Sequence, residues 1–239
     1  MMQSILLFWI SLFASLALSM PICNSTLEAG SRCRIHFFNL SPTQSSVGMR
    51  QIQHNIVKFN SMSAEKFEKY LKKHAVPVII SPNLEFYMID RHHMAFAILQ
   101  SERDNKPLLY AEVIQNWSSF SYKDFWQEMI SENYIWMFDE NGQEFYDPSK
   151  LPSSLSDMRD DPYRSLAWVV RERGGFDNSN VPYAELMWAN FFRSLVRVGI
   201  DSSDEEFEEA ADIGVKLARS ESASHLPGFK PKFRYINPL

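Results

Sequence analysis

The residues Asp90, Arg91, His92 and His93 bring a carboxylate, a guanidinium and two imidazoles together in one short stretch. Alternating apolar residues at 85–89 predict a strand before them, and the apolar run after them predicts a helix. Free N–H groups and the dipole at a helix start attract anions such as phosphate. The pattern indicates a phosphate or phosphodiester site. A plain helix cap at Asp90, one core histidine and a solvated Arg91 would give the same spacing.

The elements expected around this Asp-Arg-His-His box alternate between helix and strand, which indicates an α+β unit. In chain order they are a helix over 64–74 capped by Ser63, a strand at 76–80, a turn at 81–83, a returning hairpin strand at 85–89, a helix over 92–100 and a strand at 108–114.

Helix signals become more frequent in the second half of the chain. The expected features are a helix beginning at Ser121, a tight turn at Asn141-Gly142, a helix over 162–173 capped by Asp160-Asp161 and ended by Gly174-Gly175, a helix over 182–196, an acidic amphipathic helix within 201–220, and an extended tail at 226–239.

The composition suits a packed core, because 45% of the 239 residues are hydrophobic and 14% are aromatic. The formal net charge is -5, so the chain lacks the global positive field that supplies non-specific affinity for nucleic acid. A role in coating a chromosome is therefore disfavoured. His36, His54, His74 and His225 lack metal-ligand spacing and are expected at the surface or at helix ends.

The N-terminal region has the features of an exported protein. Residues 5–20 form an uncharged apolar run, which indicates a signal peptide at 1–19 cleaved after Ser19, with an uncleaved anchor as the alternative. The polar stretch at 24–45 is expected to be a tether. Cys23 and Cys33 could pair in an oxidising compartment or remain free thiols. The sequons Asn24-Ser25-Thr26 and Asn116-Trp117-Ser118 matter only in a glycosylating host.

Several blocks of sequence resemble one family in the same order along the chain. They are Thr43-Gln44-x-x-Val47-Gly48, Pro77-Val78-Ile79, the box at 90–93, Phe125-Trp126, Asp160-Asp161-Pro162-Tyr163-Arg164-Ser165-Leu166-Ala167, Gly174-Gly175-Phe176 and Ala184-Glu185-Leu186-Met187-Trp188-Ala189. From 41 to 196 the sequence resembles the ParB-like nucleases of the ParB/sulfiredoxin superfamily.

The resemblance implies a small mixed sheet with helices, a cleft built around the box, and a mainly helical extension in place of a helix-turn-helix domain. In that superfamily the equivalent turn binds nucleotide phosphates. The sulfiredoxin reaction is excluded because it needs a cysteine at this turn. The related serine kinases have an Asp and His pair similar to Asp90, His92 and His93, but glycine where Arg91 stands. Gln51 lies where an acidic residue is expected.

The expected roles follow from phosphoryl chemistry, which needs a base, charge stabilisation and often a metal. Only one of His92 and His93 is expected to face the cleft, because neighbours on a helix diverge by about 100°. His92, at the helix start, is the first choice as base, and His93 is the second. Asp90 would orient a histidine or hold Mg²⁺ or Mn²⁺. Further phosphate ligands are expected to be Arg91, Arg164, Gln44, Arg50 and Lys58. A salt bridge from Arg164 to Asp160 or Asp161 is the structural alternative, and Glu185 and Trp188 are assigned to packing and capping.

Together these features predict a signal peptide at 1–19, a tether at 20–40, a ParB/sulfiredoxin-like core at 41–118, a helical extension at 119–200 and an acidic helix with a proline-containing tail at 201–239. The predicted protein is secreted or periplasmic, leaves the membrane after cleavage, and acts as a phosphodiesterase on nucleic acid or nucleotide. The alternatives are a nucleotide-dependent kinase and a non-catalytic nucleotide-binding protein.

Overall fold

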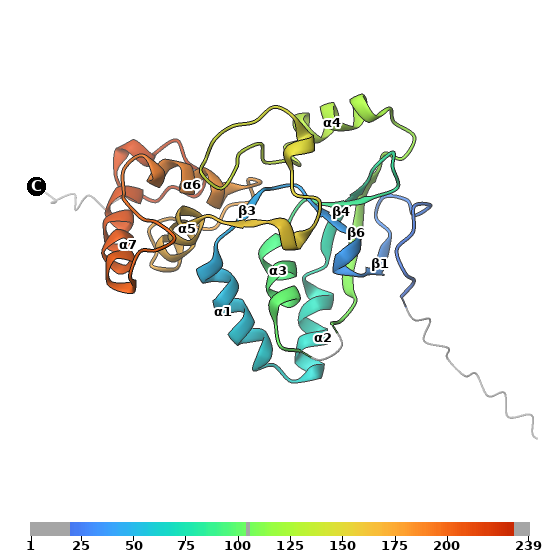
Figure 1. The fold of residues 1–239 in the computed structure, drawn as a ribbon, viewed down its shortest axis with the longest axis horizontal. Helices are drawn as coiled ribbons and strands as arrows, with labels where there is room; N and C mark the ends of the chain where they lie inside the picture. Colours follow the sequence, from blue (N-terminus) through green and yellow to red (C-terminus); the bar gives the residue numbers. More distant parts are fainter. Residues whose placement is uncertain (1–19, 104–105, 232–239) are drawn as a thin grey trace, which may run out of the picture.

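The computed structural model describes residues 20–103 and 106–231 (Figure 1). The predicted signal peptide and the tail beyond residue 231 lie outside this range. Among the described residues, no helix is both long and apolar enough to cross a membrane.

A five-stranded mixed sheet forms the centre of the first half of the chain, in the order β1-β6-β4-β5-β2. The strands are β1 (Arg32–Ile35), β2 (Leu40–Pro42), β4 (Val76–Ile80), β5 (Phe86–Met88) and β6 (Leu109–Asn116). The β4 and β5 strands pair antiparallel, as the predicted hairpin requires, whereas β4 and β6 run parallel. The mixed sheet expected from the resemblance is therefore confirmed.

Helices cover both faces of this sheet (Figure 1). On one face lie α1 (Met49–Asn60), α2 (Ala64–Lys73) and α3 (His92–Gln100), and on the other lies α4 (Tyr122–Ser131). Val78 and Ile80 of β4 pack toward α1–α3, while Ile79 between them packs toward α4. Because successive side chains of a strand point to opposite faces, this apolar run supplies both cores.

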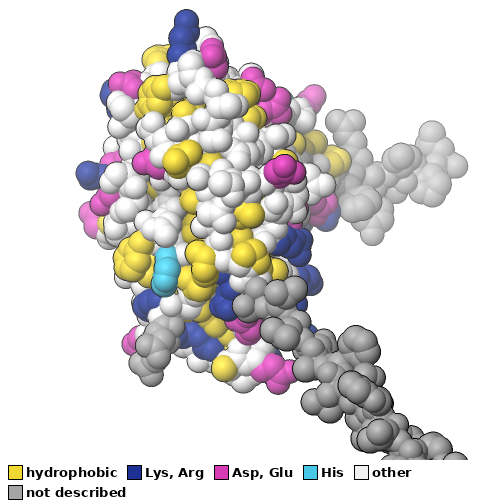
Figure 2. Space-filling view, turned by 90° about the vertical axis from the view of Figure 1, so that its right-hand side faces the viewer, with side chains coloured by type: hydrophobic (Ala, Val, Ile, Leu, Met, Phe, Trp, Pro, Cys, Tyr) yellow, Lys and Arg dark blue, Asp and Glu magenta, His cyan; other side chains and the backbone are white. Residues whose placement is uncertain are grey.

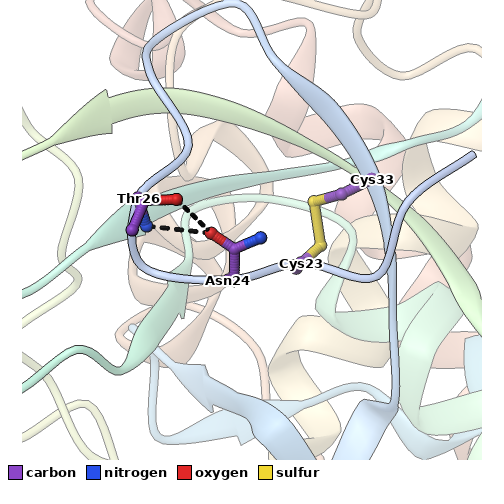
Figure 3. Close-up of a disulfide and its surroundings, with 4 residues drawn as sticks. All are labelled: Cys23, Asn24, Thr26 and Cys33. Atoms are coloured by element: carbon purple, nitrogen blue, oxygen red, sulfur yellow. Dashed lines mark hydrogen bonds between the residues drawn. A yellow bond between two sulfur atoms is a disulfide. The ribbon is translucent and has the colours of Figure 1, made fainter.

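The predicted tether at 24–45 is wrong, because this segment contains β1, a short 3-10 helix at Phe37–Asn39 and β2. Cys33, Ile35 and Phe37 alternate along it and are buried, while the residues between them face outward. The abundant serine and asparagine hid this period of two. Cys23 and Cys33 form a disulfide that holds the segment before β1 against the strand (Figure 3).

The helix α1 was not predicted, although Ile52, Ile56 and Phe59 have helical spacing and pack into the core. By contrast, α2, α3 and α4 begin where the sequence indicates, with Ser63 and Ser121 capping α2 and α4.

A second core lies among α5 (Pro162–Glu172), α6 (Ala184–Arg193) and α7 (Asp204–Ala218), at the left in Figure 1. Trp188 at its centre is fully buried and stacks on Phe176. This unit joins the sheet region through a parallel pair, β3 (Ser46–Val47) with β7 (Arg159–Asp160). Three further 3-10 helices span Pro148–Lys150, Leu155–Asp157 and Glu221–Ala223.

The acidic helix predicted at 201–220 is α7, and its apolar side is buried against α5. The segment after it is not an extended tail up to residue 231. Leu226 is buried, Gly228 adopts a φ of +75°, and the Gly228 carbonyl accepts from the Asp177 N–H at 2.8 Å. Residues 226–230 therefore pack onto the helical unit.

The face in Figure 2, which is the right-hand side of Figure 1, shows acidic and basic side chains interspersed. This face has no broad field of one sign, in keeping with the modest net charge of -5.

Candidate functional site

A cavity of about 830 Å³ lies between the start of α3, one side of α1 and the helical unit. Seven of the eight predicted site residues line it, namely Asp90, Arg91, His92, His93, Gln44, Lys58 and Arg164. Tertiary structure thus brings the box together with a residue about 70 positions further along the chain.

The box forms a tight turn into α3. Arg91 is the N-cap residue, with φ 70° and ψ 16°, so the backbone is left-handed at a position where glycine would be unstrained. Asp90 precedes the cap, and its Oδ1 accepts from the Arg91 N–H at 2.6 Å. Asp90 is therefore not the N-cap, and its side chain remains 66% exposed.

Within the described residues, no side chain caps the first turn of α3. The N–H groups of this turn need acceptors, and they lie at the positive end of the helix dipole. The start of α3 is therefore suited to receive an anion from the cavity.

Both histidines of the box are anchored to the loop at 43–48. His92 Nε2 accepts from the Thr43 N–H at 3.1 Å, and His93 Nε2 accepts from the Gly48 N–H at 2.9 Å. Burial lowers the pKa of His92 to about 4. Burial, followed by the nearby Arg164 guanidinium, holds the pKa of His93 well below its usual value.

These bonds limit what the histidines can do. A general base needs a free lone pair, and the Nε2 lone pair of each neutral ring is already occupied. Both residues line the cavity, although only one was expected to face it. The arrangement makes His92 and His93 positioning residues that hold the loop at 43–48 against the start of α3.

Arg164 is the buried member of a cluster of charged side chains. Its Nη2 contacts Glu185 Oε2, and Arg171 Nη1 lies 2.5 Å from Glu185 Oε1. The partner of Arg164 is thus Glu185, and the predicted bridge to Asp160 or Asp161 is wrong. The assignment of Glu185 to packing is also wrong, because its carboxylate lies between two arginines.

One hydrogen-bond donor of this cluster has no acceptor among the described residues. The Arg164 side chain is only 6% exposed, yet its Nη1 is buried without a hydrogen-bond partner in the described part of the chain. Burial lowers the pKa of Arg164 from its usual value, and Glu185 opposes this effect. Glu185 lies between the two guanidiniums, and Arg171 also pairs with Glu172 at 2.9 Å, so the formal charges of this cluster balance. An anion entering the cavity would still gain the unsatisfied donor of Arg164.

The other predicted phosphate ligands differ from one another. Gln44 is buried and donates from Nε2 to the Ser46 carbonyl at 2.6 Å, which shapes the loop at 43–48. Lys58 lines the cavity with its ammonium 5.0 Å from the centre of the Tyr70 ring. Arg50 points elsewhere, since it pairs with Asp204 at 2.9 Å and covers the Phe207 ring. Its assignment to the cleft is wrong.

Residues of the block at 160–165 cap the start of α1 by accepting hydrogen bonds from its backbone N–H groups. Asp160 Oδ1 accepts from the Met49 N–H at 2.9 Å, and Ser165 Oγ accepts from the Arg50 N–H at 3.2 Å. Asp161 caps α5, as predicted, by accepting from the Tyr163 N–H at 2.9 Å, and it also pairs with Arg193. Of this block, only Arg164 lines the cavity.

Sequence reasoning missed two residues of the site, Tyr183 and Arg171. The Tyr183 hydroxyl donates to the Tyr134 carbonyl at 2.8 Å and lies 2.9 Å from Thr43 Oγ1, so it ties α6 to the loop at 43–48. Nothing in the local sequence marks this contact. Arg171 follows Arg164 by two helical turns, and that spacing was a usable signal.

A divalent cation would have few protein ligands here. The described residues contain no cluster of three or more His, Cys, Asp or Glu side chains arranged for a metal. Mg²⁺ can bind through one carboxylate together with water and substrate phosphate. Asp90, exposed at the cavity, fits that single role and no larger one.

The formal charges of the side chains that line the cavity balance. The cationic side chains are Lys58, Arg91, Arg164 and Arg171, and the anionic ones are Asp90, Glu172, Asp177 and Glu185. This lining suits one localised anionic group better than an extended polyanion.

Comparison with known proteins agrees with this fold. Residues 33–194 match the family described as "Putative ParB-like nuclease". The crystal structure of a protein from Agrobacterium tumefaciens is similar, with a TM-score of 0.72 and 30% identity over 84% of this chain and 99% of that one. No curated protein matches. The chain therefore belongs to the ParB-like nuclease family.

Proposed function

We propose that this protein is an exported phosphoesterase that binds the phosphate of a nucleotide or nucleic acid strand in the cavity at α3 and cleaves a phosphodiester bond. One observation carries the proposal. The uncapped first turn of α3 and the unpartnered Nη1 of the buried Arg164 belong to the same cavity. Both supply donors for phosphate oxygens.

The proposed chemistry assigns a role to each group. First-turn N–H groups of α3 and Arg164 Nη1 stabilise the negative charge on the non-bridging oxygens. The exposed Asp90 carboxylate accepts a proton from water as the water oxygen bonds to phosphorus. The bond from phosphorus to the leaving oxygen breaks, and that oxygen keeps the electron pair and takes a proton from solvent. A divalent cation bound at Asp90 would supply further charge stabilisation. His92 and His93 position the loop at 43–48 and transfer no proton in the reaction.

The size and charge of the cavity also favour a small substrate over an extended one. A volume of about 830 Å³ lies within the usual range for small-ligand pockets. The cavity lining carries as many anionic as cationic side chains and so lacks the basic surface that a duplex backbone requires. A nucleotide or the end of a single strand therefore suits this site better than double-stranded DNA.

Export is part of the proposal. The apolar run at 5–20 predicts a signal peptide, and the Cys23–Cys33 disulfide supports an oxidising compartment. ATP is scarce in such compartments, which favours hydrolysis over a kinase reaction.

The test is hydrolysis of single-stranded DNA, RNA and nucleoside triphosphates by the purified chain with Mg²⁺ or Mn²⁺. Asp90→Asn should lower turnover at least about 100-fold with little effect on affinity, because it removes the base and leaves the anion site. Arg164→Lys should weaken binding about tenfold or more, since lysine lacks the guanidinium fork. Arg50→Gln is the matched control and should leave both unchanged.

Each alternative predicts a different result. Nucleotide binding that Arg164→Lys weakens, without turnover of any substrate, would replace the phosphoesterase with a binding protein. Phosphoryl transfer from ATP to a protein or small acceptor would favour the kinase. Turnover that is indifferent to both Asp90→Asn and Arg164→Lys would place the active site elsewhere.

A further inference from the structure

Two N-glycosylation sequons occur in the described chain, and the structure distinguishes between them. Asn24-Ser25-Thr26 lies in the loop between the disulfide cysteines, and Asn116-Trp117-Ser118 lies at the end of β6. Glycan attachment uses the side-chain amide nitrogen, Nδ2, so the surroundings of that atom decide which asparagine can carry a glycan in the folded protein.

Asn24 presents its amide at the surface. The residue is exposed, and its Oδ1 accepts from both the Thr26 N–H at 3.0 Å and the Thr26 hydroxyl at 2.6 Å (Figure 3). Nδ2 forms no hydrogen bond with any residue that the structure describes. The two side chains that define the sequon are thus in contact, and the reactive nitrogen is left over.

Asn116 has its amide fully engaged. Its Nδ2 donates to the Ser25 carbonyl at 3.0 Å and to the Leu27 carbonyl at 2.8 Å, and its Oδ1 accepts from the Ser118 N–H at 3.0 Å. A glycan on Nδ2 would remove at least one donor and force a bulky group between β6 and the loop. The native fold is therefore incompatible with a glycan at Asn116.

We infer that, in a secretory pathway with an oligosaccharyltransferase, the chain carries one N-linked glycan, attached to Asn24, and none on Asn116. The donor is a lipid pyrophosphate-linked oligosaccharide. Nδ2 bonds to the anomeric carbon, the bond from that carbon to the pyrophosphate oxygen breaks, and Nδ2 loses a proton while the lipid pyrophosphate leaves with the electron pair. The inference rests on the proposed export and is independent of the proposed catalysis.

The glycan would lie away from the cavity. Asn24 does not belong to the cavity lining, and the segment before β1 lies on the opposite side of the sheet region from α5–α7 (Figure 1). A glycan here would shield the loop that the disulfide closes, and substrate access would be unaffected.

The experiment is expression of the full chain in a glycosylating eukaryotic cell, with the mass of the secreted protein measured before and after treatment with an N-glycosidase. Thr26→Ser retains the sequon and should retain the mass shift. Asn24→Gln and Thr26→Ala should abolish it. Ser118→Ala removes the second sequon while preserving the Asn116 side chain and the Ser118 N–H, so it should leave the shift unchanged.

Other outcomes overturn the inference in distinguishable ways. If the protein is secreted but its mass does not change on treatment with the N-glycosidase, the glycan is refuted and the proposed export stands. A shift that Ser118→Ala removes and Asn24→Gln retains would assign the glycan to Asn116. Protein retained in the cytosol would refute export and the glycan together, whatever hydrolysis the purified chain shows.

Discussion

The helices α1 and α3 both begin beside the loop at 43–48. They differ in whether the backbone N–H groups of the first turn have hydrogen-bond acceptors. At the start of α1, N–H groups of Gly48, Met49 and Arg50 donate to His93, Asp160 and Ser165. At the start of α3, no described side chain caps the first turn, and the turn opens into the cavity beside Arg164. The protein supplies hydrogen-bond acceptors to the start of α1, whereas the N–H groups at the start of α3 are available to a ligand.

The contrast shows that a recognisable motif can serve stability rather than chemistry. The block at 160–165 is one of the motifs that carry the family resemblance, and Arg164 within it was predicted to bind phosphate. Asp160 and Ser165 instead cap α1, and Asp161 caps α5. Each accepts from an N–H group that has no acceptor within its own helix. Only Arg164 of this block has a donor free for an anion.

The largest loss of stability should come from adding a side chain at Gly48, the N-cap residue of α1. A Cβ on Gly48 would lie 2.7 Å from the Ser165 backbone nitrogen, and neither backbone can move without breaking the caps of α1. Gly48→Ala should therefore lower the free energy of unfolding by about 3 kcal/mol, measured by urea denaturation. Gly199→Ala is the control, since its nearest contact is the movable Asp201 side chain. Equal losses in the two variants would contradict this account.

The second effect is a dependence of stability on pH. Because the pKa of His92 falls to about 4 in the folded state, the unfolded chain binds a proton first as the pH drops below about 6.5. Stability contributed by neutral His92 is present above that pH and is lost progressively down to about pH 4. Between pH 7 and pH 5 the loss should be about 2 kcal/mol.

Comparison with His92→Gln isolates this contribution. Glutamine can still accept from the Thr43 N–H but does not titrate, so the variant should lose less stability between pH 7 and pH 5 than the parent. Chemical denaturation at both pH values measures the difference. If stability falls equally in the two proteins, protonation of His92 on unfolding does not cause the pH dependence.

A smaller effect is expected from removing one cap of α1. Asp160→Ala should cost about 1 kcal/mol of stability, as for other capping side chains. Nucleotide affinity should be unchanged, because Asp160 does not belong to the cavity lining. Thermal unfolding and calorimetric titration together check both statements. A loss of affinity without a loss of stability would place Asp160 in the binding site.

The smallest effect should come from Arg50, which pairs at the surface with an Asp204 side chain that is 91% exposed. Arg50→Gln should change stability by about 0.5 kcal/mol or less, as is usual for exposed ion pairs. Turnover and nucleotide affinity should not change. A clear loss of affinity would restore Arg50 to the cleft.

Local patterns predicted most of the individual elements. The caps at Ser63, Ser121 and Asp161 marked three helix starts correctly, because a side-chain oxygen that accepts from a neighbouring N–H is a short-range feature. The segments that were missed, β1, β2 and α1, lack such signals. The N-cap residue of α1 is Gly48, which has no side chain to accept a hydrogen bond. The acceptors for the N–H groups at this helix start come from residues 45 to 115 positions away in sequence.

The sequence by itself determined the α+β class, the hairpin, the Asp-Arg-His-His box and membership of the family, since periodicity, turn residues and ordered motifs are all written along the chain. Only the tertiary structure decided which groups are free to act. It committed both histidine lone pairs to the loop at 43–48, paired Arg164 with Glu185, and turned Arg50 away from the cavity. The reason is that hydrogen-bond and charge partners are assigned by proximity in the folded chain, which spacing along the sequence does not specify.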